Sequence, residues 1–63
     1  MHTLIPIKTL DDVNGNRVAT IYKNQVDVFF VIKNCLNGEL KMWTFNTVET
    51  AEKCLRNINR GLM

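Results

Sequence analysis

The pattern of apolar and polar positions along the chain predicts four strands followed by one helix. The clearest strand is residues 26–33, where six of the eight residues are β-branched or aromatic and apolar, and none is Gly or Pro. We expect this segment to be the central strand of a sheet, with further strands at about 4–10, 17–23 and 39–45. Pro6 cannot donate a hydrogen bond to a neighbouring strand, so the first strand is expected at an edge of the sheet.

Short turn signals separate the predicted strands. Asn14-Gly15 and Asn37-Gly38 are typical of tight hairpins, because Asn and Gly adopt the positive φ angles that such turns need. Asn24-Gln25 is a short polar break before the central strand. Short connections in series predict an antiparallel meander.

Residues 47–60 are predicted to form a helix. Asn46 or Thr47 is suited to cap it, with Glu49 completing a capping box, and Gly61 is a typical stop. Glu49–Lys53 and Glu52–Arg56 have the spacing of favourable ion pairs on the exposed side. The apolar positions, three and four residues apart, form one stripe: Val48, Ala51, Leu55, Ile58 and Leu62. The expected fold class is α+β, a small antiparallel meander of three to four strands with one C-terminal helix packed on one face.

A helix with one apolar stripe covers only one face of the sheet. In the central strand the even-numbered side chains are all apolar, so we expect these to face the helix: Val26, Val28, Phe30 and Ile32. Phe29 and Val31, flanked by Asp27 and Lys33, are then expected on the other face. If Asn24-Gln25 forms a two-residue turn, Val18 and Tyr22 lie beside them.

Two registers are open for the last strand. A two-residue hairpin at Asn37-Gly38 places Ile32 opposite Trp43 and Phe30 opposite Phe45, in the core. A five-residue loop instead pairs Phe29 with Trp43 and Lys33 with Glu39, which moves Trp43 to the outer face. The Asn-Gly dipeptide favours the hairpin.

The large apolar groups on the face that the helix does not cover indicate an interaction surface. A chain of 63 residues buries only about 60% of the surface that it exposes when unfolded, so association is a common source of added stability. We therefore expect a homodimer. The alternative is that the N-terminal strand folds over this face and closes a small barrel. The expected self-association residues are Phe29, Val31, Leu40, Met42, Val18 and Tyr22.

The chain shows no set of residues typical of catalysis or metal binding. One histidine, His2, and two cysteines do not make a zinc site. Asp11 and Asp12 are adjacent in a turn and are interpreted as solvated turn formers rather than an acid–base pair. Cys35 lies near Lys33 and Lys41 in the sequence, and a reactive thiol there is the alternative to an inert one. We predict that the protein is not an enzyme and binds no cofactor or metal.

Charge and hydropathy bear on the cellular location of the protein and on whether it binds nucleic acid. No secretory signal or membrane-length apolar run is present, so we expect a cytoplasmic protein with reduced thiols. The formal charge is +2, from eight Lys or Arg and six Asp or Glu. This excess is weak for a dedicated nucleic-acid binder.

The segment from Trp43 to Glu52 joins the last predicted strand to the helix, with an aromatic residue, a Thr and an acidic-Ala pair. It resembles the strand-to-helix junction of the arm-binding domains of phage-type integrases and of the plant AP2 domain, over about residues 17–60. Those domains lay a three-stranded sheet into the DNA major groove, so the resemblance implies a DNA-binding module as an alternative function. Their DNA-facing strands carry several Arg, Lys and aromatic residues, whereas this chain offers Arg17, Lys23, Lys33 and Lys41.

The main expectation is a non-catalytic binding protein that acts through protein–protein interaction, as an inhibitor or regulator of a larger partner. Antitoxin-like regulators and phage-encoded modulators of host machinery are of this kind. The sequence does not identify the partner. The candidate partner-binding residues are Lys33, Lys41, Trp43, Arg56 and Arg60.

Overall fold

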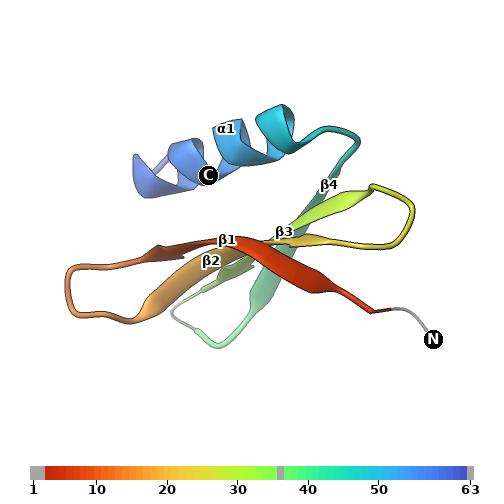
Figure 1. The fold of residues 1–63 in the computed structure, drawn as a ribbon. Helices are drawn as coiled ribbons and strands as arrows, with labels where there is room; N and C mark the ends of the chain where they lie inside the picture. Colours follow the sequence, from red (N-terminus) through yellow and green to blue (C-terminus); the bar gives the residue numbers. More distant parts are fainter. Residues whose placement is uncertain (1–2, 36, 63) are drawn as a thin grey trace.

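The computed structural model describes residues 3–35 and 37–62, which form a four-stranded antiparallel sheet with a helix packed on one face (Figure 1). The strands lie side by side in chain order and are β1 (Ile5–Asp11), β2 (Arg17–Lys23), β3 (Phe29–Asn34) and β4 (Leu40–Phe45). Helix α1 (Val48–Asn59) follows β4. The predicted α+β meander with one C-terminal helix is confirmed. No helix in the described residues is long and apolar enough to span a membrane.

The ends of α1 are set by residues that the sequence singled out. The hydroxyl oxygen of Thr47 accepts a hydrogen bond from the backbone N–H of Thr50 at 3.3 Å, which satisfies one of the free donors of the first turn. At the other end Gly61 adopts a φ of 76°, and the N–H of Leu62 donates to the Asn57 carbonyl at 2.9 Å. This is the left-handed helix stop that glycine favours.

The expected ion pairs along α1 are absent from the structure. The ion pairs shown for the described residues join Arg17 to Asp11 and Lys23 to Asp27, and neither Glu49–Lys53 nor Glu52–Arg56 is among them. Exposed pairs of this kind contribute only a few tenths of a kcal/mol, so their geometry is weakly determined.

The connection between β2 and β3 is a five-residue loop, 24–28, and not a two-residue turn. The side-chain oxygen of Asn24 accepts hydrogen bonds from the N–H groups of Val26 and Val28, at 3.0 and 2.9 Å. Asp27 takes a left-handed conformation with a φ of 61°, which Asp tolerates better than most residues. Strand β3 therefore begins at Phe29, later than the predicted start at residue 26.

This loop reverses the expected faces of β3. A two-residue turn at Asn24-Gln25 places Val18 opposite Val31, whereas the structure pairs Ile21 with Val31. The shift is an odd number of residues, and an odd shift moves every side chain of a strand to the other face of the sheet. Phe29 and Val31 face α1, and Phe30 and Ile32 face away from it, so the predicted assignment of β3 is wrong.

The register between β3 and β4 combines features of both predicted alternatives. Trp43 and Phe45 pack against the core below the helix, as the two-residue hairpin predicted. They lie opposite Val31 and Phe29, which are odd-numbered positions of β3, as the five-residue loop predicted. The predicted Phe29–Trp43 pair is not formed, because Trp43 lies opposite Val31, two residues further along β3. The five residues between the paired Asn34 and Leu40 are 35–39, whereas the prediction had 34–38. The favoured Asn37-Gly38 two-residue hairpin is therefore not formed.

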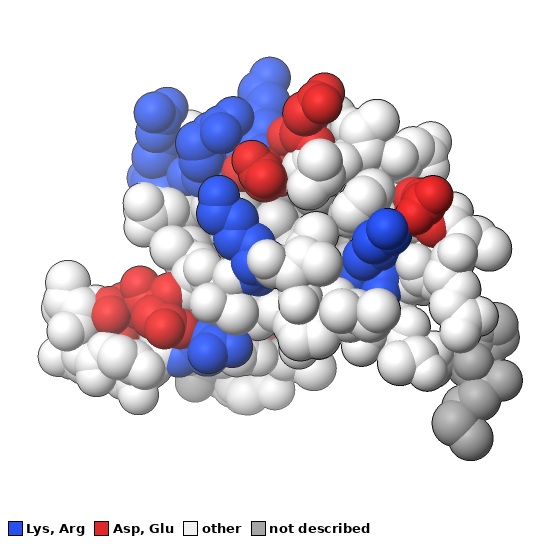
Figure 2. Space-filling view, viewed as in Figure 1, with Lys and Arg blue, Asp and Glu red and all other residues white. Residues whose placement is uncertain are grey.

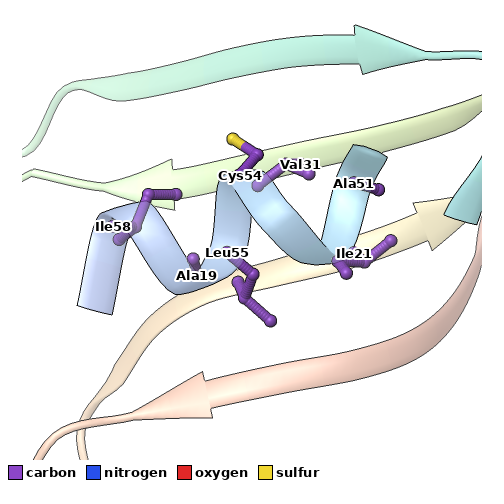
Figure 3. Close-up of a cluster of buried hydrophobic side chains, with 7 residues drawn as sticks. All are labelled: Ala19, Ile21, Val31, Ala51, Cys54, Leu55 and Ile58. Atoms are coloured by element: carbon purple, nitrogen blue, oxygen red, sulfur yellow. The ribbon is translucent and has the colours of Figure 1, made fainter. Parts of the chain in front are cut away.

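The core lies between α1 and the centre of the sheet (Figure 3). Its buried residues are Ala19 and Ile21 of β2, Val31 of β3, and Ala51, Cys54, Leu55 and Ile58 of α1. Val48 of the predicted stripe is half-buried. Leu62 lies beyond the helix stop and is 69% exposed, so the stripe ends at Ile58.

The N-terminal strand does not close a barrel. Strand β1 pairs with β2 at the edge of an open sheet and leaves the face opposite α1 uncovered (Figure 1). The turn before β2 explains this path, since the Asp12 carboxylate accepts hydrogen bonds from the N–H groups of Asn14 and Asn16, both at 2.9 Å. Such a tight turn returns the chain alongside the strand that it has just left.

Candidate interaction surface

The face of β2, β3 and β4 that points away from α1 is largely apolar and carries no charged side chain. Side chains alternate along a strand, so these positions follow from the buried residues Ala19, Ile21 and Val31 and from the strand register. We call them the outer face: Val18, Thr20 and Tyr22 of β2, Phe30, Ile32 and Asn34 of β3, and Leu40, Met42 and Thr44 of β4.

The apolar groups of the outer face remain accessible. Leu40 and Met42 are 67% and 60% exposed, while Tyr22, Phe30 and Ile32 are half-buried by their neighbours in the sheet. Thr20, Ile32 and Met42 lie in one row across the three strands, and Thr20 is buried at 5% exposure. No described element covers this surface, since α1 lies on the opposite side and β1 lies at the edge (Figure 1).

The charged residues of the strands lie on the other side or at strand ends. By alternation Lys33 and Lys41 point to the side that carries the helix, and they are directly opposite each other in the β3–β4 pair. Lys53 and Arg56 are exposed on α1, and Arg60 is exposed at its C-cap. Figure 2 shows several Lys and Arg side chains over the helix at the upper left of that view, with Asp and Glu side chains beside them and further charged side chains lower in the view. The charged residues of the strands thus avoid the outer face, which is neutral.

The structure keeps three of the six predicted self-association residues on the outer face, namely Tyr22, Leu40 and Met42. Val18 lies on that side by alternation, but it is half-buried and packs against the core. Val31 is fully buried and Phe29 packs against the core, so neither reaches a partner in the folded chain. Phe30 and Ile32 take their place. The sequence held one signal for the longer loop between β2 and β3, namely Asn24 followed by Asp27. The side chain of Asn24 accepts hydrogen bonds from the loop backbone, and Asp27 tolerates the positive φ that the loop needs.

The predicted partner-binding residues lie on several elements. Lys33 and Lys41 are opposite each other in the β3–β4 pair. Arg56 is exposed on α1, and Arg60 is exposed at its C-cap. Trp43 is half-buried and packs against the core, so it serves the fold. The basic residues spread over the helix side of the molecule.

An open hollow that carries both signs of charge lies between the ends of the two outer hairpins, with a volume of about 890 Å³. Arg17, Lys33 and Lys41 line it together with Asp12 and Glu39. No group of three or more His, Cys, Asp or Glu that could hold a metal ion occurs among the described residues. The Asp12 carboxylate accepts hydrogen bonds from two N–H groups of the turn, as expected for a turn former. Asp11 is the last residue of β1 and forms an ion pair with Arg17 of β2 at 2.6 Å.

The two cysteines differ in their surroundings and form no disulfide with each other. Cys35 is half-buried at the start of the β3–β4 connection, whereas Cys54 is a core residue of α1. Burial raises the pKa of the Cys54 thiol, because the charged thiolate is poorly solvated in the core. The low thiolate fraction and the lack of access both protect Cys54 from reaction.

Thiol labelling is expected to modify Cys35 alone in the native protein at neutral pH. Cys54 should react only when urea unfolds the chain, as counted by mass spectrometry after iodoacetamide treatment. The raised pKa also predicts that the stabilising effect of the neutral Cys54 thiol is complete below the unfolded-state pKa and is lost as the pH rises through the folded one. Rapid native labelling of both thiols would contradict the buried position of Cys54.

No family model matches the chain, and no curated protein or solved structure matches it either. The outer face and the distribution of charge are therefore the observations on which a functional proposal rests.

Proposed function

We propose that the chain is a small non-catalytic binding protein that inhibits or regulates a larger protein partner, that its outer face is the binding surface, and that it works as a homodimer. One observation carries this proposal. The outward positions of an antiparallel sheet are usually polar when they face water. Here they hold Tyr22, Phe30, Ile32, Leu40 and Met42, and no charge. Contiguous apolar surface of this kind typically marks a protein contact.

The size of the outer face supports a contact of useful strength. Three strands about 4.8 Å apart and about six residues long present roughly 300 Å². Covering this area contributes on the order of 5 kcal/mol, before the costs of association are subtracted. A domain of this length is itself stable by only about 3–9 kcal/mol. Burial of the outer face against a partner is therefore a large effect for this chain.

The same observation counts against the DNA-binding alternative. A sheet that lies in a DNA groove neutralises phosphates with Lys and Arg side chains. The outer face supplies none, because Arg17, Lys23, Lys33 and Lys41 occupy the alternate positions of their strands. We therefore place protein binding first.

The test is affinity capture with matched surface variants, from an extract of cells that make the protein naturally. Ile32→Lys and Tyr22→Lys put a charge on the outer face, and each should reduce the captured partner at least tenfold. Val13→Lys is the control, because Val13 is 100% exposed in the β1–β2 turn. Circular dichroism of each variant checks that the fold is retained. A partner that binds the wild type and both outer-face variants equally would place the binding surface elsewhere.

A further inference from the structure

The two edges of the sheet differ in how open they are to another strand. Strand β1 contains Pro6, and its pairing with β2 shifts register between Pro6 and Lys8 and again between Leu10 and Asp11. Proline and irregular register are common protections of an edge strand. Strand β4 has neither Pro nor Gly, and its register with β3 is unbroken from Leu40 to Phe45. An edge of this regular kind is a template for pairing with a further strand.

We propose that β4 pairs antiparallel with β4 of a second copy about a two-fold axis at Met42, which joins two four-stranded sheets into one continuous sheet. This inference rests on the homodimer proposed above. It adds the part of the molecule that forms the dimer contact, the β4 edge, and the residues that lie opposite each other there. The outer faces of the two copies then adjoin and present one neutral apolar surface of twice the size to the partner.

Symmetry limits the register. In a closed edge-to-edge pair of identical antiparallel strands, the two-fold axis is perpendicular to the sheet, so like faces adjoin and one residue lies opposite its own copy. An axis at Lys41 sets two like charges directly opposite, which is unfavourable. An axis at Trp43 leaves Leu40 beyond the paired segment. An axis at Met42 avoids both, and it keeps Leu40 and Met42, the two most exposed apolar residues of the strand, within the paired segment.

The side chains brought together by the Met42 axis are complementary. On the outer face Met42 meets its own copy, and Leu40 lies opposite Thr44 of the second copy. On the helix side Lys41 lies opposite Trp43 of the second copy, and this contact occurs twice. An ammonium group beside an indole ring is a favourable cation–π arrangement. The strand is thus suited to a copy of itself, whose positive charges meet aromatic rings and not each other.

Cysteine cross-linking tests the axis. Residues directly opposite in an antiparallel pair have Cα atoms about 4.5–5.5 Å apart, a separation that a disulfide spans. In a Cys35→Ser background, Met42→Cys should give a covalent dimer as the main species after mild oxidation. Thr44→Cys is the matched control on the same strand and face, because its two copies are then about 14 Å apart and should not cross-link. Ile32→Cys reports instead on a face-to-face dimer.

Light scattering across a concentration series tests the association itself. The wild type and Val13→Lys should approach dimer mass at high concentration. Met42→Lys, which places two like charges on the axis, should weaken self-association at least tenfold while circular dichroism shows the fold intact.

The outcomes separate this inference from the proposed function. A wild-type monomer at every concentration overturns the edge pairing and the homodimer, and leaves partner capture by the outer face as an independent result. A dimer that cross-links through Ile32→Cys or Thr44→Cys and not through Met42→Cys overturns the edge register alone. Unchanged dimer mass in Met42→Lys also overturns it.

Discussion

Replacing Val31 by Asp is expected to unfold the protein, whereas replacing its neighbour Ile32 by Asp leaves it folded. Val31 is fully buried, opposite Ile21 and Trp43 and beneath α1. An unpaired carboxylate there costs more than the whole stability of about 3–9 kcal/mol expected for a domain of this length. Ile32 points to the outer face, where water solvates the new charge. Circular dichroism and thermal unfolding of the two variants provide the measurement.

The comparison of these adjacent positions tests the register directly. The sequence pattern placed Ile32 in the core and Val31 outside, so it predicts the opposite ranking. Loss of the fold in Ile32→Asp with a folded Val31→Asp would show that the faces of β3 are reversed. A folded Ile32→Asp variant also distinguishes an effect on stability from an effect on binding. We expect this variant to keep its structure but no longer to bind the protein partner.

Leu55→Ala is expected to lower the free energy of unfolding by about 2–5 kcal/mol, the usual range for a buried leucine. Leu55 is 4% exposed and lies over the sheet in the centre of the core. Its loss removes contacts between α1 and the sheet, and a small domain has few others to replace them. Urea unfolding followed by circular dichroism measures the change, provided that the variant remains folded in water.

The matched control is Leu62→Ala, the same substitution just beyond the helix stop. Leu62 is 69% exposed, so its truncation should change the free energy of unfolding by no more than about 0.5 kcal/mol. An equal loss of unfolding free energy in the two variants would mean that Leu62 packs in the core, as the predicted apolar stripe of the helix implied. A larger loss in Leu62→Ala would contradict the position of the core.

The residues of the interaction surface could be predicted from the sequence where apolar and polar residues alternate along a strand, and could not be predicted where they do not. Strand β2 alternates, with Ala19 and Ile21 inward and Tyr22 outward. Tyr22 had been expected on this face beside Phe29 and Val31 through a two-residue turn that is not formed. Strand β4 likewise places Leu40 and Met42 outward, as the hairpin alternative predicted. In β3 both sides are apolar, so its pattern alone does not favour either face.

The local sequence pattern was enough to identify the elements: four strands, one helix, the edge position of the Pro6 strand, the Thr47 cap and the Gly61 stop. These depend on local conformational preferences and on hydrogen bonds between near neighbours. The face of β3 that enters the core depends instead on how the strands pair. Each of its flanking connections spans five residues, where the short turn signals had suggested two. Because side chains alternate with a period of two, that odd difference places Val31 beneath α1 and leaves Phe30 and Ile32 for a partner.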